Sequence, residues 1–156
     1  MIFISHVKKI VGTGILCAGL AACATGYSQS TRFEIRAASL TESPDWQKAN
    51  LLDDPGTTVY IAPEVLLDNA DVAQANARKD LGGQVLVIIQ MTPAGTIRMG
   101  SASRVLLRQR MAVMINGEVL TAPVVSAPLS GNRFAITGFK SFEEAQQAAE
   151  GIAPGK

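Results

Sequence analysis

The sequence predicts an α+β domain, in which a mostly antiparallel sheet has helices packed on one face. Three observations predict it. Short β-type runs alternate with longer helix-type runs, Asn116-Gly117 interrupts this alternation with a hairpin signal, and Ser141 begins a final helix-type run. Both central residues of a type I′ turn need positive φ, which asparagine and glycine tolerate best. A tight hairpin within the alternation favours an antiparallel sheet over a parallel one.

The strands are predicted from their periodicity and length. Residues 32–36 alternate charged and apolar side chains, which is the period of a half-buried strand. Residues 85–91 form the most apolar run after the N-terminal segment, which predicts a central strand buried on both faces. Further strands are expected at residues 59–61, 111–115, 118–124 and 134–137.

Residues 39–58 contain two prolines, a glycine and paired acids, and therefore predict a loop. Trp46 within it is expected to form a lid on the core, with a ligand platform as the alternative. The strand at 59–61 is expected to stop before Pro63, because proline cannot donate to a sheet ladder.

The first helix is expected to begin at Asp68 or Asn69, either of which can cap it, and to run to about Leu81. Gly82-Gly83 is its predicted end. Four residues would share one face at a spacing of three to four: Ala70, Ala73, Ala77 and Leu81. The small residues on this face would let the helix lie close to a sheet.

Two more helices are predicted. Thr92-Pro93 begins one that runs to about Gln109, with Ile97 facing inward and with Gly95 and Gly100 each weakening it by up to about 1 kcal/mol. The last begins with a capping box formed by Ser141 and Glu144. Its predicted inner face is Phe142, Ala145, Ala149 and Ile152, and its predicted end is Pro154-Gly155.

The first 22 residues have the composition of an export signal. Two lysines precede 13 uncharged residues, too few to cross a hydrocarbon core of ~30 Å. The run ends Leu20-Ala21-Ala22-Cys23, which resembles the bacterial lipobox. The resemblance implies cleavage between Ala22 and Cys23 and a lipid on Cys23. The alternatives are an ordinary secretory signal cleaved nearby and an uncleaved anchor.

This organisation predicts a signal at residues 1–22, a lipidated tether at 23–31 and one domain at 32–153. The tether would hold the domain on the periplasmic side of a membrane in the cell envelope. Ala24 follows the lipidated cysteine, where aspartate often marks inner-membrane retention, so the outer membrane is expected if the organism is Gram-negative.

The composition of the mature chain argues against several kinds of partner and functional site. The signal holds two lysines and no acid, so its removal takes Lys+Arg from 14 to 12 against 13 acids, a net charge of about −1. A near-neutral chain without a basic run argues against nucleic acid as a partner. His6 and Cys17 lie in the signal, so the mature chain has no histidine for a zinc site or a triad. We expect no metal, no cofactor and no enzyme activity.

The remaining charged groups have structural explanations. Asp53-Asp54 predicts a solvated turn, with calcium binding or catalysis as the alternative. Asp68 and Asp71 suit the positive end of a helix, and Glu143-Glu144 has the same explanation. Three arginines predict either a solvated face or a binding patch for anionic lipid or an acidic partner, because two of them would share a helical face: Arg104, Arg108 and Arg110.

The C-terminal half resembles a known family. Residues 110–125 read RMAVMINGEVLTAPVV and residues 129–149 read LSGNRFAITGFKSFEEAQQAA. They are similar to the head of the first periplasmic domain of SecD, an accessory subunit of the Sec export machine. The matching positions are Asn116-Gly117, Ala122-Pro123, Gly131, Ile136-Thr137-Gly138 and Glu143-Glu144-Ala145. The resemblance covers roughly Arg32 to Ile152 and implies a ferredoxin-like or head-like arrangement.

The resemblance implies a binding role. SecD works with membrane-spanning helices, and beyond its signal this chain has none, so we do not expect it to be a motor. The expected function is a membrane-anchored module that contacts a polypeptide client or an envelope protein, through an exposed strand edge. The alternative is a structural or self-associating lipoprotein. An enzyme using Asp68, Asp71 and an arginine in a cleft is the least favoured reading.

Overall fold

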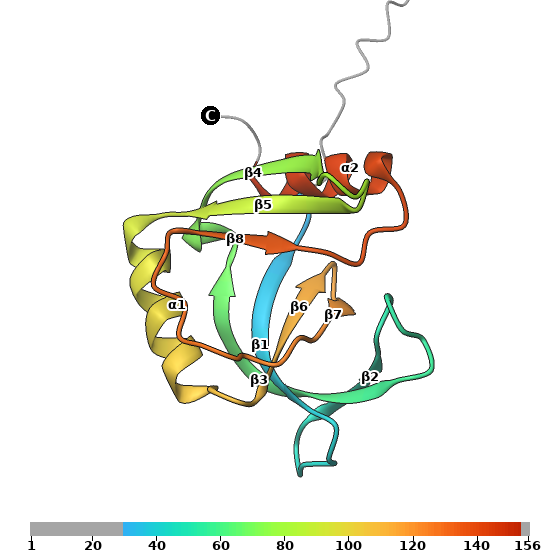
Figure 1. Ribbon diagram of the computed structural model, residues 1–156. Coiled ribbons are helices and arrows are strands. Elements are labelled where there is room, and N and C mark those ends of the chain that lie inside the picture. The colour runs from blue at the N-terminus through green and yellow to red at the C-terminus, as the bar shows by residue number, and fades with distance from the viewer. Residues whose placement is uncertain (1–29, 154–156) are drawn as a thin grey trace, which may run out of the picture.

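The computed structural model describes residues 30–153, and within them eight strands form two antiparallel sheets (Figure 1). The larger sheet has the order β2-β3-β1-β6-β7 and the smaller has β4-β5-β8. The strands are β1 (Phe33–Ser39), β2 (Gln47–Asn50), β3 (Thr58–Asp68), β4 (Val72–Lys79), β5 (Val85–Met91), β6 (Arg110–Ile115), β7 (Glu118–Thr121) and β8 (Arg133–Ile136). The helices are η1 (Asn69–Asp71), α1 (Pro93–Val105) and α2 (Phe142–Ile152). The α+β class is confirmed, with the strands divided between two sheets.

The larger sheet curls until its two ends meet. Directly after β2, the Leu52 N–H donates to the Val119 carbonyl at 2.9 Å, and the Asp53 N–H donates to the Leu120 carbonyl at 3.2 Å. Leu51 and Val119 form a parallel bridge at the same place. The inner face of this curled sheet holds a small core: Ala38, Leu51, Val59, Ile61, Ala112, Met114, Val119 and Ala122.

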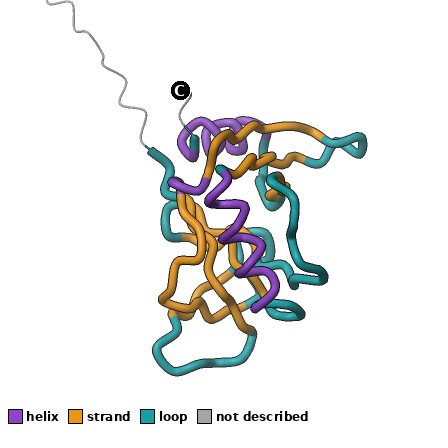
Figure 2. The backbone as a smooth tube through the Cα atoms, turned by 90° about the vertical axis from the view of Figure 1, so that its left-hand side faces the viewer, coloured by secondary structure: helices purple, strands orange, loops and turns teal. Residues whose placement is uncertain are grey.

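A second and larger core lies between the two sheets and the helices. Figure 2 shows α1 running alongside the strands of the larger sheet and α2 lying across one end. Each layer contributes large, fully buried side chains, among them Phe33 from β1, Ile89 from β5 and Ile152 from α2. The outward face of β5, with Ile88 and Gln90, is only half-buried, so the prediction that this strand is buried on both faces was wrong.

The helix predicted from residue 69 to 81 is a strand. Asp68 caps as expected, accepting from the Ala70 N–H at 2.8 Å, but the helical turn ends at Asp71. From Val72 onward the chain pairs with β5, and Ala75 and Ala77 turn toward the core with a period of two. Tertiary pairing with an apolar neighbour therefore overrides the helical preference of the alanines.

The glycine pair that was expected to end this helix instead turns a hairpin. The Asp80 carboxylate accepts from the N–H groups of Gly82 and Gln84 at 2.8 Å each. Gly83 has a φ of 82°, a conformation that glycine adopts without strain. The turn joins β4 to β5.

Strand β3 does not stop at Pro63 but continues to Asp68. The pairing with β1 shifts here: Ala38 lies opposite Ile61, and Arg36 lies opposite Val65. Proline is tolerated at such a bulge because no ladder bond is lost there. The predicted loop before this strand contains β2, which pairs with the first half of β3.

Helix α1 presents two glycines, a serine and a methionine to the domain. Ile97 was expected to face inward but is 71% exposed, and the helix ends at Val105 rather than at Gln109. Its buried residues are Gly95, Met99, Gly100 and Ser103. An ideal Cβ on Gly95 would lie 2.4 Å from the Asp71 carbonyl oxygen, so only glycine allows this close approach.

The hairpin and the last helix are confirmed. Asn116 and Gly117 have φ values of 52° and 87°, and they join β6 to β7, which ends at Thr121 rather than at Val124. Ser141 Oγ accepts from the Glu144 N–H at 3.1 Å, and the Glu144 carboxylate accepts from the Lys140 N–H at 2.8 Å. Phe142 is half-buried, with the Lys79 Nζ 5.6 Å from its ring centroid.

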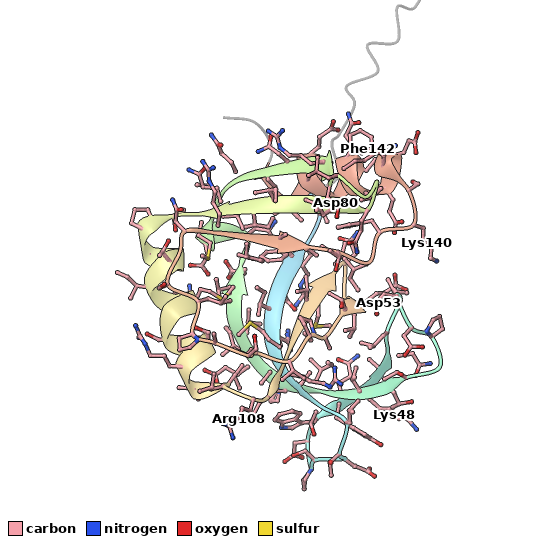
Figure 3. All side chains as sticks on the ribbon, viewed as in Figure 1. Lys48, Asp53, Asp80, Arg108, Lys140 and Phe142 are labelled. Atoms are coloured by element: carbon pink, nitrogen blue, oxygen red, sulfur yellow. The ribbon has the colours of Figure 1, made fainter. Side chains whose placement is uncertain are left out.

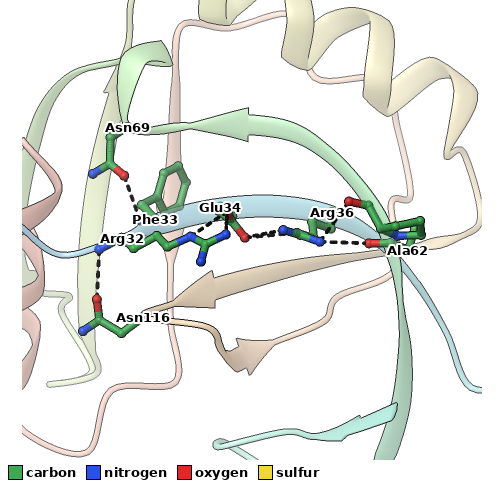
Figure 4. Close-up of polar contacts among 8 residues, drawn as sticks. Arg32, Phe33, Glu34, Arg36, Ala62, Asn69 and Asn116 are labelled. Carbon is green, nitrogen blue, oxygen red and sulfur yellow. Dashed lines mark hydrogen bonds and ion pairs between the residues drawn. The ribbon is translucent and has the colours of Figure 1, made fainter. Parts of the chain in front are cut away.

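A buried carboxylate on β1 holds the arginine that reaches β3. Glu34 is 6% exposed and pairs with Arg32 and Arg36 (Figure 4). The Arg36 guanidinium also donates to the Pro63 carbonyl at 3.0 Å, at the bulge of β3. Asn69 fixes the start of β1 by accepting from the Phe33 N–H at 2.9 Å.

Candidate functional site

An apolar slot lies between the smaller sheet and the segment that connects β7 to β8. This segment runs across the front of the larger sheet and then beside α1 to β8 (Figure 1). The cavity has a volume of about 260 Å³. Its floor includes Ile35 from β1, Met111 from β6 and Met99 from α1. One wall is Phe134 and Ala135 of β8, and the other is the segment 123–129. We call this cavity the β8 slot.

The wall formed by β8 is an unpaired strand edge. The Met91 N–H donates to the Asn132 carbonyl at 2.8 Å, so these two residues form a hydrogen-bonded pair. Such pairs alternate along an antiparallel ladder, so Phe134 and Ile136 also bond to β5, while the N–H and C=O groups of Arg133 and Ala135 point away from it. Within residues 30–153 no backbone bond from another segment reaches those groups.

The edge of β7 is occupied. The segment after β2 hydrogen-bonds to β7 through Leu52 and Asp53. This follows from the curling of the larger sheet, which brings the chain after β2 to its opposite end. The edge of β8 is the one that lines the apolar slot.

A second hollow adjoins the slot and contains Trp46. It has a volume of about 480 Å³ and is lined by residues 38–43, Trp46, residues 108–110 and Val124. Val124 lines both hollows, so they adjoin each other there. Trp46 is half-buried and belongs to neither core, so the predicted role as a lid was wrong. We call this hollow the Trp46 groove.

The wall shared by the two hollows is fixed by hydrogen bonds. Val125 accepts from the Arg108 N–H and donates to the Gln109 carbonyl, both at 2.8 Å. The Met111 N–H donates to the Pro123 carbonyl at 3.0 Å. Because the segment 123–125 is tied to residues 108–111 on both sides of Val124, the slot and the groove keep a fixed relation.

The structure separates the three predicted binding arginines. Arg104 is exposed on α1 and does not line the groove. Arg108 follows the end of α1, so the shared helical face that was expected does not exist. Arg108 and Arg110 both line the groove, and Arg110 Nη1 donates to the Ala122 carbonyl at 2.7 Å. Figure 3 shows Arg108 at the opposite end of the molecule from Phe142.

The carboxylates take the structural places that the sequence predicted. Asp71 is 2% exposed, accepts from the Asp68 N–H and pairs with Arg98 at 3.0 Å, which ties η1 to α1. Asp54 accepts from the Thr57 hydroxyl in an exposed turn. Within the described residues no group of three or more metal-ligating side chains is found.

Sequence reasoning missed both hollows. It predicted a strand at 134–137 but had no means of placing it at a sheet edge. It also had no means of bringing Trp46 to Arg108, 62 positions along the chain. The predicted cleavage and lipid-attachment residues, Ala22 and Cys23, and the neighbouring Ala24 lie outside the described residues. None of the helices in residues 30–153 is long and apolar enough to cross a membrane.

Comparison with known proteins places the chain in a family. The SecDF P1 head subdomain matches residues 44–155, more than half of the chain. The translocase subunit SecDF of Thermus thermophilus is 32% identical over 124 residues, which are 80% of this chain and 17% of that protein. The subunit SecD of Acidaminococcus fermentans is 32% identical over 84 residues, which are 54% of this chain and 20% of that protein.

Solved structures agree with this match. A structure described as "Structure and function of a membrane component SecDF that enhances protein export" superposes with a TM-score of 0.66 at 25% identity, covering 80% of this chain and 63% of that chain. SecDF in a super-membrane-facing form has the same TM-score at 24% identity, covers 80% of this chain and 19% of that chain, and shows the fold alone. The chain thus spans about a fifth of the length of the curated relatives above. It belongs to the family of SecDF P1 head subdomains.

Proposed function

We propose that this chain is a non-catalytic binding module outside the cytoplasm, and that it holds an extended stretch of polypeptide in the β8 slot. The observation that carries the proposal is the unpaired edge of β8, which runs beside an apolar floor. An extended chain laid on such an edge forms main-chain hydrogen bonds whatever its sequence. The alternate side chains of the guest would rest on the floor of the slot.

The slot suits weak and tolerant binding. Arg133 and Ala135 together offer two N–H and two C=O groups to a guest strand. Each net hydrogen bond contributes about 1 kcal/mol, so the edge alone gives modest affinity. Met99 and Met111 of the floor are core residues, so the apolar surface open to a guest lies mainly on Val124 and Leu129, which are 50% and 38% exposed. A reversible contact with many exported chains fits this chemistry.

The family membership supports a role beside protein export or envelope assembly. The relatives are named protein translocase subunits, and the solved SecDF is described as enhancing protein export. Because the match covers about a fifth of those subunits, the proposal is limited to contact with polypeptide and does not include the motor.

The N-terminal sequence supports attachment to a membrane. The lipobox-like Leu20-Ala21-Ala22-Cys23 follows an export-type signal, so we place the domain on the periplasmic side with a lipid on Cys23. Several acyl chains would anchor it durably, since each buried CH₂ contributes about 0.8 kcal/mol. Ala24 favours the outer membrane in a Gram-negative organism.

The same edge supports the alternative of self-association. A strand edge that pairs with a guest can also pair with the edge of a second copy. A concentration-dependent dimer of the purified chain that competes with peptide would favour this structural role over a client-binding one.

Replacing Ala135 with proline tests the proposed function. Proline removes the outward N–H and puts a ring in its place, while the bonds of Phe134 and Ile136 to β5 remain. We expect the Kd for an uncharged 12-residue peptide of Val, Thr and Ser to rise at least about tenfold, or about 1.4 kcal/mol, by fluorescence anisotropy. A peptide with proline at alternate positions should not bind the unaltered chain.

Ala135→Thr is the matched control, because threonine keeps the N–H and is favoured in strands. Its affinity should stay close to that of the unaltered chain. Equal binding by the proline variant, with an unchanged unfolding transition, would show that the peptide does not use this edge.

A further inference from the structure

The β8 slot adjoins the Trp46 groove at Val124, and the groove carries a positive charge. The lining residues include Arg108 and Arg110 and one carboxylate, Glu42, which makes a net charge of +1. Neither arginine takes part in an ion pair within residues 30–153. A guanidinium presents a planar set of donors that matches a carboxylate. The groove therefore offers a place for an anion next to an apolar strand site.

On this basis we propose that the preferred client segment has two parts: an extended uncharged stretch in the β8 slot and an acidic stretch bound by Arg108 and Arg110. The inference rests on the proposed function and names the class of polypeptide for the same site. The occupant is an acidic segment of the client because neither arginine has an ion-pair partner within residues 30–153 and both line a groove that adjoins the slot at Val124.

Two residues at the groove have a left-handed backbone conformation. Arg108 has a φ of 65° and Asp45, next to Trp46, has a φ of 66°. Both lie in hydrogen-bonded turns, because the Trp46 N–H donates to the Ser43 carbonyl and the Gln109 N–H donates to the Leu106 carbonyl. The hydrogen bonds of residues 108 and 109 to Val125 hold Arg108 in place beside the groove.

The apolar part of the groove has the composition of a binding surface. Leu40 is 52% exposed and Val124 is 50% exposed, and both line the groove with the half-buried Trp46. Tryptophan and arginine are enriched among the residues that contribute most to protein interfaces. The apolar residues beside the arginines therefore favour a binding surface over a solvated face.

Val124 lies where the two parts meet. Arg110 and Val124 face each other as an antiparallel bridge, and Val124 also lines the slot. We therefore expect the acidic residues of the client directly next to its uncharged stretch.

Peptides that share one uncharged 12-residue core test the inference. Four carry Asp-Asp or Lys-Lys at the N-terminal or the C-terminal end, and the fifth carries Ser-Ser at both ends. With the purified full chain at low salt, we expect one of the two Asp-Asp peptides to bind about tenfold tighter than the Ser-Ser peptide. The Lys-Lys peptides should bind more weakly. The preferred end would give the direction of the guest strand.

Three variants test which residues cause the preference for acidic peptides. In Arg108→Asn/Arg110→Gln the affinities of the five peptides should converge; asparagine is chosen because it tolerates the positive φ. Glu42→Gln should increase the acidic preference about two- to threefold, because it removes the one opposing carboxylate of the groove. Arg104→Gln, outside the groove, should leave the preference unchanged.

The outcomes separate this inference from the proposed function. If none of the peptides binds, the proposed function fails. If the Ser-Ser peptide binds and the charged ends make no difference, this inference alone is wrong. It is also wrong if the acidic preference survives in the double arginine variant.

Discussion

Gly95→Ala is expected to destabilise the domain by about 3 kcal/mol, although alanine is the better helix former. The added Cβ would lie 2.4 Å from the Asp71 carbonyl oxygen and 2.9 Å from the Asp71 Cβ. That carbonyl cannot move freely, because it accepts from the Thr92 N–H at 2.9 Å, and the Asp71 carboxylate is held by Arg98. Helix α1 would have to shift away from η1. Urea unfolding monitored by circular dichroism measures the loss.

Gly100→Ala is the matched control on the same helix. Its Cβ would lie 3.4 Å from the Leu129 carbonyl oxygen, which is an ordinary contact. We expect a change between zero and a gain of about 1 kcal/mol from helix propensity. Equal stability of the two variants would contradict the close contact between α1 and η1.

Glu34→Ala is expected to cost about 3 kcal/mol. The carboxylate is 6% exposed, and its Oε2 lies 2.9 Å from Nη2 of Arg36, whose side chain is 16% exposed. Removing it leaves a largely buried guanidinium with only the backbone carbonyls of β3 as partners. Breaking a buried pair in this way costs more than the pair itself contributes, because the remaining charge stays desolvated.

A double variant distinguishes the cost of an unpaired buried charge from the cost of lost packing. Glu34→Met/Arg36→Met replaces both charges by apolar side chains and should recover at least half of the loss, as measured by thermal unfolding. Full loss in the double variant would mean that packing, rather than an unpaired charge, dominates this position. Arg32 is exposed and should matter little by itself.

Sequence signals correctly predicted the features that depend on neighbouring residues, namely a turn and a helix cap. Asn116-Gly117 formed the expected turn, and Ser141 and Glu144 capped the last helix as expected. Tertiary contacts decided the rest. Residues 72–79 have a helical composition but pair with β5, and no pattern within them reveals that neighbour. Ile97 was expected to face inward, but the face of α1 with Gly95 and Gly100 packs against the domain and leaves Ile97 exposed.

The site could be predicted only as separate residues. Arg108 and Arg110 were singled out for their charge, and the structure adds Trp46 and Val124 to them. An exposed strand edge was predicted but could not be assigned to a strand, because whether β7 is free depends on how far the larger sheet curls. Periodicity predicts that a segment is a strand but not which of its edges remains unpaired.

The central claim is that an extended polypeptide pairs with the free edge of β8. Hydrogen exchange of individual backbone amides by NMR, with and without the uncharged 12-residue peptide, tests it most directly. We predict slower exchange at Arg133 and Ala135, whose N–H groups point outward, and little change at Phe134 and Ile136, which already bond to β5. Peptide binding that leaves Arg133 and Ala135 unprotected would contradict the account.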